Sequence, residues 1–425
     1  MEGLEDPKFF GVDTDLSFKK GMYMTKIKSL HAREVLDSRG HPTVEVELNG
    51  FRAICPAGTS RGKYEAIELH DGGSRYHGIG VSRAVENVNK IIAKRLIGIS
   101  LDQQRVDEIL CSLAGSNKWK IGGNATTAVS IAACKALGEK ILGFKPSVPV
   151  PFSLIVEGGA HAGNDLSIQE FMLVPLNFTT FREAIRAVSE IYYTLENTVV
   201  KKYGKTASNV GYEGGFALPI GDTKTVLNLI SHAIEEAGYS KEVKIALDAA
   251  ASQFFNSKYN IDGRSLNASQ LADYYLDLTK IYPIISIEDP FNEEDFESFA
   301  MLKAKAKRFL VVGDDLTVTN ISRIKKAIEK DSCNTLLVKV NQIGTVTEAI
   351  EAVTMARKSD WNIVVSHRSG DSEDTFIADF AVGLGALGAK FGAPMRGERT
   401  SKYNQLLRLE EQTILTYAGR NFKLP

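Results

Sequence analysis

The chain has 425 residues, of which 44% are hydrophobic, and a formal net charge of -1 at pH 7. This length allows two domains or one barrel-sized domain with an addition, and the near-neutral charge gives no electrostatic reason to expect nucleic acid or an acidic membrane as a partner. The four cysteines lie far apart and form no CxxC pair, which argues against a zinc site or a disulfide framework and favours a cytoplasmic location.

The first 23 residues contain neither an apolar core of signal-peptide length nor an arginine-rich amphipathic pattern. We therefore predict a flexible N-terminal tail over residues 1–23. No apolar run elsewhere approaches the roughly 18 to 20 residues that a membrane span requires, so no spanning helix is expected.

Residues 26–48 contain two segments of alternating polar and apolar residues separated by DSRGHP, and this pattern predicts a β-hairpin. Residues 51–54 extend the predicted sheet. The next stretch, CPAGTSRGKYEA at 55–66, is rich in small residues. Gly58 and Gly62 can give this loop unusual dihedral angles and mobility, and an ordinary turn is an equal alternative.

Three segments with a helical spacing of apolar residues follow, near 81–95, 101–113 and 124–142. The last is rich in alanine, which permits close helix packing. Together with the hairpin, these segments predict an α+β N-terminal domain over residues 24–145, and the sequence SVPVP just beyond it marks the boundary.

From residue 146 to residue 425 the pattern changes to a repeat of apolar strand, polar residue and helix. Near-continuous apolar strands separated by helices indicate a parallel sheet, and five or more such units indicate a closed barrel. Polar residues at the C-terminal ends of barrel strands are the usual location of catalytic groups. We therefore predict a catalytic β/α barrel with six strand-end residues at its mouth: Asp248, Glu288, Asp314, Lys339, His367 and Lys390.

Three of these strand-end residues are carboxylates, and they come from successive strands: Asp248, Glu288 and Asp314. Like charges that converge must share protons or bind a cation. Carboxylate oxygens that leave room for water and substrate suit Mg²⁺. The alternative is that carboxylates here cap the following helices, which fits Asp315 and Asp289.

Lys339 interrupts the apolar run NTLLVKVNQIGT, which has the character of a buried strand. A buried ammonium either pairs with an anion or gives up its proton, although a single edge-strand lysine often extends to solvent instead. An unpaired lysine beside further cations has a depressed pKa and can act as a base. We interpret Lys339 as a base or an anion binder.

The other late strand-end residues add positive charge beside Lys339, because Arg368 and Ser369 follow His367 and lie between the two lysines in sequence. This combination facing a metal suggests a substrate with a carboxylate and a phosphate. A carbon acid next to a carboxylate is very weak, so its enolate needs concentrated positive charge. Mg²⁺ and Lys390 could supply that charge.

Two glycine-rich segments, at 157–171 and 209–219, each carry a glutamate, Glu170 and Glu213, and the first also carries His161. A glutamate near glycines is usually a solvated loop residue. Two carboxyl groups facing a lysine base are, however, what β-elimination of hydroxide requires, because the leaving group must be protonated from the face opposite the base.

Signature segments occur along the chain in the order found in one known family, and the likeness covers residues 25–422. The chain resembles the enolases, which dehydrate 2-phosphoglycerate. This resemblance implies a barrel whose second strand runs antiparallel. The matching segments are REVLDSRGHPTVEVE, GGAHAG, IQEFM, NVGYEGG, SIEDP, DDLTVTN, LLVKVNQIGT, VSHRSGDSEDTFIAD and NQLLRLEE.

The resemblance implies roles residue by residue. Lys339 would take the C2 proton, and Glu213, assisted by Glu170, would protonate the departing C3 hydroxyl. The three carboxylates would hold a first Mg²⁺ that binds the substrate carboxylate, and Ser60 would help bind a second with the phosphate. The remaining contacts to substrate would come from Lys390, Gln169, Arg368, Ser369 and His161, with His367 nearby.

Several positions depart from the family pattern. The closing loop, often SGAST, is AGTSR here, so Ala57 and Arg61 could change its closure. Tyr212 replaces an acidic residue before Glu213, and the lost charge could alter the pKa of that acid. Glu157 stands where asparagine is common. Gly397 stands where serine is common.

We expect the chain to catalyse the Mg²⁺-dependent, reversible dehydration of 2-phospho-D-glycerate to phosphoenolpyruvate in glycolysis, as a cytoplasmic lyase. The resemblance also suggests a homodimer or a higher assembly. Two alternatives stay open. One is a paralogue acting on a related phosphorylated or phosphonylated three-carbon acid, and the other is a non-catalytic binding protein that retains the fold.

Overall fold

The computed structural model describes residues 26–59, 61–138, 144–412, 415–422 and 424, and the structural statements below concern these residues. The predicted tail over residues 1–23 and the predicted metal ligand Ser60 lie outside them. The division into domains at residues 145 and 146 stays a prediction. Within the described part of the chain, no helix is long and apolar enough to cross a membrane.

The N-terminal part begins with an antiparallel sheet of β1 (Leu30–Leu36), β2 (Pro42–Leu48) and β3 (Phe51–Ile54), in that order. The turn between β1 and β2 forms because Asp37 Oδ1 accepts hydrogen bonds from the backbone N–H groups of Arg39 (2.8 Å) and His41 (3.1 Å). The predicted hairpin and its extension are confirmed.

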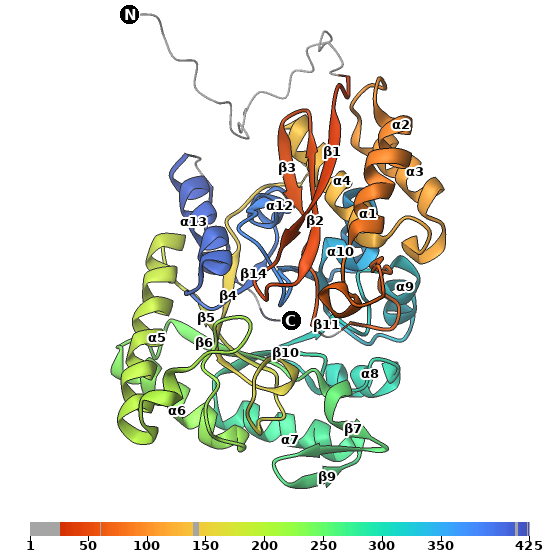
Figure 1. Ribbon diagram of the computed structural model, residues 1–425. Coiled ribbons are helices and arrows are strands. Elements are labelled where there is room, and N and C mark those ends of the chain that lie inside the picture. Colours follow the sequence, from red (N-terminus) through yellow and green to blue (C-terminus); the bar gives the residue numbers. More distant parts are fainter. Residues whose placement is uncertain (1–25, 60, 139–143, 413–414, 423, 425) are drawn as a thin grey trace, which may run out of the picture.

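Four helices follow the sheet: α1 (Ser82–Asn87), α2 (Ala93–Leu96), α3 (Gln103–Ala114) and α4 (Gly123–Leu137). The first predicted helix is interrupted, because a π-helical turn over Val88–Ile92 separates α1 from α2. Small residues let α4 pack closely on β2 and β3. Figure 1 shows this part stacked against one side of the barrel, where α3 and α4 contact α10 (Val340–Ile343) and α11 (Val346–Lys358).

The barrel is closed in the order β10-β11-β12-β13-β14-β4-β5-β6. The strand β5 is antiparallel to both of its neighbours and the other pairs are parallel, which confirms the expected fold class and the reversed second strand. Its strands are β4 (Val150–Glu157), β5 (Glu170–Pro175), β6 (Val243–Asp248), β10 (Ile284–Glu288), β11 (Leu310–Gly313), β12 (Thr335–Val338), β13 (Asn362–Ser366) and β14 (Gly388–Gly392).

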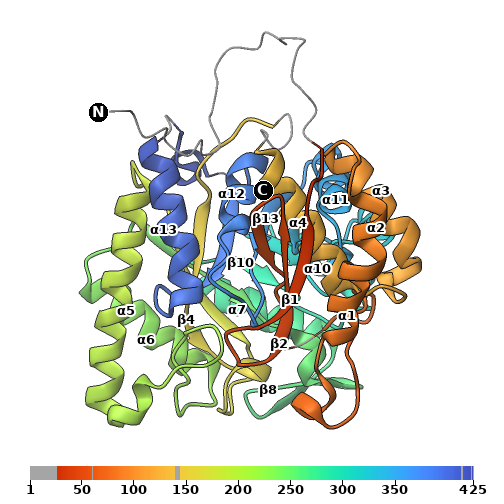
Figure 2. The same cartoon turned by 45° about the horizontal axis from the view of Figure 1, so that its top comes forward.

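Helices surround the barrel, and α5 and α13 lie side by side on one flank (Figure 2). Many begin at a polar residue whose side chain accepts a backbone N–H of the first turn, as Thr180 does for α5 and Asn320 for α9. The remaining elements are α5 (Phe181–Tyr203), α6 (Thr223–Glu236), α7 (Ala268–Ile281), α8 (Phe296–Lys305), α9 (Ile321–Glu329), α12 (Phe376–Leu384), α13 (Gly397–Gln412) and a small sheet of β7 (Phe255–Asn256), β8 (Lys258–Ile261) and β9 (Arg264–Leu266).

The N-terminal part reaches the mouth of the barrel through the loop that follows β3. The backbones of Ala57 and Gly370 exchange two hydrogen bonds of 2.8 Å, and the N–H of Ser38 donates to the carbonyl of Asp371 at 2.8 Å. The loop after β13 is therefore covered by residues from the start of the chain, so the mouth is built from both parts of the fold.

Candidate active site

The polar residues that end the barrel strands come together at one end of the barrel. Asp248 pairs in register with Glu170 on one side and with Glu288 on the other. Glu170 is the first residue of its strand, but β5 runs in the reverse direction and so brings it to the same end. The pocket here includes most of the predicted site residues: His161, Gln169, Glu170, Glu213, Asp248, Asp314, Lys339, His367, Arg368, Ser369 and Lys390.

One side of the pocket, which we call the lysine half, consists of Lys339 and Lys390 with Asp248, Glu288 and Asp314. The ammonium of Lys390 lies 2.9 Å from Asp248 Oδ2 and 2.9 Å from Glu288 Oε1. All three side chains are buried, so charge-assisted hydrogen bonds replace the water that these ions lose.

The second lysine, Lys339, is paired with a carboxylate, because its ammonium donates to Asp314 Oδ2. Lys339 lies one residue beyond β12, where the chain turns into α10. Burial lowers the pKa of Lys339, but the charge of Asp314 outweighs burial and the pKa is raised. The expected depressed pKa is wrong in this arrangement, because the lysine has an anionic partner.

Three carboxylates and two ammonium groups leave the lysine half one positive charge short. Burial, reinforced by the charge of Asp248, raises the pKa of Glu288 well above its usual range. The pKa of Asp314 is instead lowered, since Lys339 more than offsets its burial. An all-oxygen, buried and under-neutralised donor set fits a hard divalent cation such as Mg²⁺.

Among the described residues, two groups of three side chains could hold a metal ion, because within each group one ligand atom from every residue lies within 4.8 Å of the others. The groups are His161, Glu170 and Glu213, and Asp289, Asp314 and Asp315. The predicted trio of Asp248, Glu288 and Asp314 is not such a group, and Lys390 bridges two of its members, Asp248 and Glu288. The alternative role for Asp289 and Asp315 as helix caps is wrong, since Asp295 caps α8 and Asn320 caps α9. Asp289 instead accepts the backbone N–H groups of Asp314 and Asp315.

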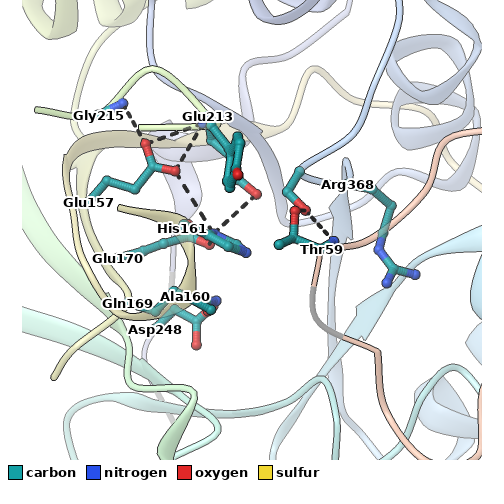
Figure 3. Close-up of polar contacts among 12 residues, drawn as sticks. Thr59, Glu157, Ala160, His161, Gln169, Glu170, Glu213, Gly215, Asp248 and Arg368 are labelled. Atoms are coloured by element: carbon teal, nitrogen blue, oxygen red, sulfur yellow. Dashed lines mark hydrogen bonds and ion pairs between the residues drawn. The ribbon is translucent and has the colours of Figure 1, made fainter. Parts of the chain in front are cut away.

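The opposite side, which we call the glutamate half, consists of Glu157, Glu170, Glu213, His161 and His367. Figure 3 shows the three carboxyl groups gathered around His161. Its Nδ1 lies 3.5 Å from Glu213 Oε1 and 3.9 Å from the nearest oxygen of each of the other two glutamates. The ring of His367 approaches from the other direction, with Nε2 2.9 Å from Glu213 Oε2.

The carboxyl groups of the glutamate half differ in protonation. Burial, reinforced by the charge of Glu213, raises the pKa of both Glu157 and Glu170 well above the usual range. Burial also raises the pKa of Glu213, but His367 and His161 outweigh it and hold that pKa well below the usual range. Glu157 and Glu170 therefore hold a proton more tightly than Glu213 does.

Glu157 supports the loop that carries Glu213. Its carboxyl oxygens accept the backbone N–H of Glu213 at 2.9 and 3.2 Å and that of Gly215 at 3.1 Å. The carboxyl group can approach because Gly211 lacks a side chain, and a Cβ there would lie 2.6 Å from Glu157 Cδ. The sequence identified Glu157 only as a departure from a family pattern and gave it no role.

The predicted phosphate anchors lie across the pocket, where Figure 3 places Arg368 opposite the glutamate half. The Arg368 guanidinium forms two hydrogen bonds with Glu65, at 2.8 and 3.2 Å. Ser369 Oγ accepts the backbone N–H of Thr59 at 2.7 Å. Sequence reasoning missed Glu65. Its only signal was a carboxylate within the small-residue loop.

The other predicted residues occupy separate positions. Gln169 donates to Asp248 Oδ2 at 3.2 Å and so lines the floor of the pocket. Arg61 turns outward to Glu68, at 2.5 Å. The side chain of Tyr212 is 43% exposed, so it does not fill the position of a buried charge beside Glu213.

Comparison with known proteins gives matches over both parts of the fold. The model of the enolase C-terminal TIM barrel domain matches residues 145–425, and that of the enolase N-terminal domain matches residues 27–141. The enolase of Methanocaldococcus jannaschii is 50% identical over 418 residues, covering 94% of this chain and 99% of the relative. The enolase of Pyrococcus furiosus is 49% identical over 421 residues, covering 94% and 98%. The chain belongs to the enolase family.

Proposed function

We propose that the chain catalyses the reversible dehydration of 2-phospho-D-glycerate to phosphoenolpyruvate, a hydro-lyase reaction of glycolysis and gluconeogenesis, and that it uses two Mg²⁺ ions. The observation that carries the proposal is the division of one pocket into a lysine half and a glutamate half. Elimination of water from a β-hydroxy acid needs a base on one face and a proton donor on the other, and the two halves supply them.

Lys339 acts as the base and takes the proton from C2 of the substrate through its Nζ atom. In its present pairing with Asp314 the ammonium is charged, so it must lose its proton before it can act. A Mg²⁺ ion held by Asp248, Glu288 and Asp314 would neutralise these carboxylates and stabilise the negative charge that develops on the substrate carboxylate. Lys390, fixed by its carboxylate partners, adds positive charge on the same side.

Glu213 protonates the C3 hydroxyl group, which leaves as water while the C2–C3 double bond forms. The pKa of Glu213 lies well below its usual range, so it must first receive a proton. Glu170 is a suitable source, because burial favours its protonated form and its ligand oxygen lies within 4.8 Å of that of Glu213. This assigns Glu170 the assisting role and leaves His161 and His367 to hold Glu213 in place.

The phosphate is held by Arg368 and Ser369, with Gln169 and His161 completing the substrate contacts. A guanidinium suits a phosphate because its planar N–H groups match two oxygens at once. The second Mg²⁺ would bind the phosphate with the help of Ser60, which the family pattern supports. We also propose a homodimer and a cytoplasmic location, which are consistent with the family and with the absence of a spanning helix in the described residues.

An assay of the purified chain tests this proposal. With 2-phospho-D-glycerate and Mg²⁺ we expect growth of the absorbance band of the enol product, and we expect excess chelator to stop it. A chain that shows no such growth under any Mg²⁺ concentration is not a 2-phosphoglycerate dehydratase. A panel of phosphorylated and phosphonylated three-carbon acids then tests whether the exposed Tyr212 and the outward-turned Arg61 have changed the substrate, and Tyr212→Asp should restore the usual preference if they have.

A further inference from the structure

A completely buried arginine lies behind the glutamate half. Arg399 is 0% exposed and comes from the first turn of α13. Its Nη1 atom lies 2.7 Å from Nδ1 of His367 and donates to the carbonyl of Arg368 at 2.6 Å. Its Nη2 atom donates to the carbonyls of Ser369 (2.6 Å) and Tyr212 (3.2 Å). One side chain therefore contacts the loop after β13 and the loop that carries Glu213.

The contact with Arg399 determines which nitrogen of His367 carries the proton. A guanidinium has only donors, so Nδ1 of His367 must accept and cannot carry a hydrogen. A neutral ring then has its hydrogen on Nε2, which faces Glu213 Oε2 at 2.9 Å. Among the described residues neither of these two atoms has a hydrogen-bond partner of ordinary geometry, so each is the nearest polar group available to the other. A hydrogen on Nε2 is thus within reach of the proposed acid after a small rotation of either side chain.

The surroundings keep the ring of His367 neutral. Burial lowers its pKa to about 4, the charge of Glu213 opposes this, and the charge of Arg399 adds to the lowering. The charge of Asp371 also opposes the lowering, by a smaller amount. The single hydrogen of a neutral ring can lie on either nitrogen. The contact of Arg399 with Nδ1 leaves only Nε2 to carry it.

We infer that Arg399 is a positioning residue that fixes His367 in the Nε2–H tautomer and so orients the carboxyl group of Glu213 for proton transfer. This inference rests on the proposed function of Glu213. The same guanidinium holds the backbone before Glu213 and the backbone of Arg368 and Ser369, so it also sets the spacing between the proton donor and the phosphate anchors.

A neighbouring residue provides a matched control. Lys402 lies one turn further along α13, is equally buried, and holds the same loop after β13 by donating to Asp371 Oδ1 at 2.8 Å and to the carbonyl of Ser372. Within the described residues it makes no hydrogen bond or ion pair with His367. Loss of Lys402 should therefore disturb packing without changing the tautomer.

Nitrogen NMR of the full chain labelled with ¹⁵N-histidine tests the tautomer directly, with the His367 signals identified by their loss in His367→Asn. In the unsubstituted chain we expect Nδ1 to resonate as an unprotonated nitrogen and Nε2 as a protonated one. A hydrogen on Nδ1 would overturn the inference. This measurement needs neither substrate nor turnover, so its failure is distinct from failure of the proposed function.

The variant Arg399→Lys keeps a positive charge but cannot reach all four acceptors. We expect a mixed tautomer and a loss of about 10²-fold in kcat, at the lower end of what a positioned proton donor contributes. Lys402→Gln should lower the melting temperature yet keep the tautomer. An unchanged tautomer in Arg399→Lys, or an equal change in Lys402→Gln, would show that Arg399 supports the loop only in a general way.

Discussion

The two halves of the pocket contain the same number of carboxyl groups but hold them in different states. In the lysine half, Asp314 is paired with an ammonium and its pKa is lowered. In the glutamate half, Glu213 lies beside two imidazole rings and Glu157 accepts backbone N–H groups. Within the described part of the chain, only Glu170 of these three has an ammonium within 4.0 Å, that of Lys390 at 3.2 Å. Burial there raises the pKa of Glu157 and Glu170.

This difference shows how one fold can place a base and an acid in a single buried cavity. A buried carboxylate with an ammonium of its own, as Asp314 has in Lys339, keeps a low pKa and can hold a metal. Glu288 and Glu170 share the one ammonium of Lys390 with Asp248, and their pKa values stay raised, so such groups hold a proton that they can deliver. Glu213 has a low pKa for a different reason, because two histidines adjoin it. The neighbours of each carboxyl group thus determine whether that group can bind a metal or can donate a proton.

The largest expected effect is that of removing the base from the lysine half. Lys339→Ala should reduce exchange of the C2 hydrogen of 2-phosphoglycerate with solvent deuterium by about 10⁴-fold, the upper range for a general base. The Mg²⁺ affinity should be largely retained, because the three proposed ligands remain. Normal C2 exchange in this variant, measured by proton NMR, would remove Lys339 from the role of base.

Removal of the acid from the glutamate half should separate the two steps. Glu213→Gln keeps the size of the side chain but cannot donate a carboxyl proton, so formation of the enol product should fall by about 10²- to 10⁴-fold while C2 exchange continues. The ratio of exchange to dehydration would then rise. Equal loss of both rates would mean that the halves do not divide the chemistry as proposed.

A smaller effect, on stability, tests the charge balance of the lysine half. Lys390→Met leaves the carboxylates around it without their shared ammonium and should lower the free energy of unfolding by about 3 to 5 kcal/mol in the presence of chelator. The melting temperature measures this loss. Adding Glu288→Gln should recover part of it, since one buried charge is removed. No recovery in the double variant would contradict the proposed balance.

Much of this arrangement could be predicted from the sequence. Apolar runs that end in a polar residue identified the barrel and six residues at its mouth, because parallel strands present their ends at one edge. The reversed β5 could not be read from its composition, since EFMLVP is as apolar as the parallel strands, and it came from the resemblance to a family.

The electrostatic state of the site was harder to predict. The sequence suggested a lowered pKa for Lys339, and this was wrong because its partner Asp314 comes from another strand and the distance between them is not visible in the order of residues. Arg399 was missed for a different reason. It continues the buried stripe of α13 that includes Tyr403 and Leu406, at the spacing of a helical core position, where an arginine is not expected.

The smallest expected effect comes from a carboxyl group outside the pocket. It tests whether a buried carboxyl group without an ammonium of its own has a raised pKa there too. Asp379, in the first turn of α12, receives a hydrogen bond from Gln405 at 3.0 Å, and burial raises its pKa to about 6. A carboxyl group whose pKa is higher in the folded chain binds protons better there, so its contribution to stability declines as the pH rises from about 4 to about 6. Asp379→Asn keeps an acceptor for Gln405 and removes this decline.

We therefore expect Asp379→Asn to raise the melting temperature. The gain in the free energy of unfolding should be about 1 kcal/mol larger at about pH 8 than at about pH 5. The matched control is Asp374, in the same segment, which is paired with Lys135 at 2.7 Å and accepts the backbone N–H of Phe376 at 2.9 Å. Asp374→Asn should destabilise the chain at both pH values, because it breaks the ion pair with Lys135. If both substitutions had the same sign, the presence of a cation would not be what separates the two classes of buried carboxyl group, and the contrast between the halves of the pocket would need another cause.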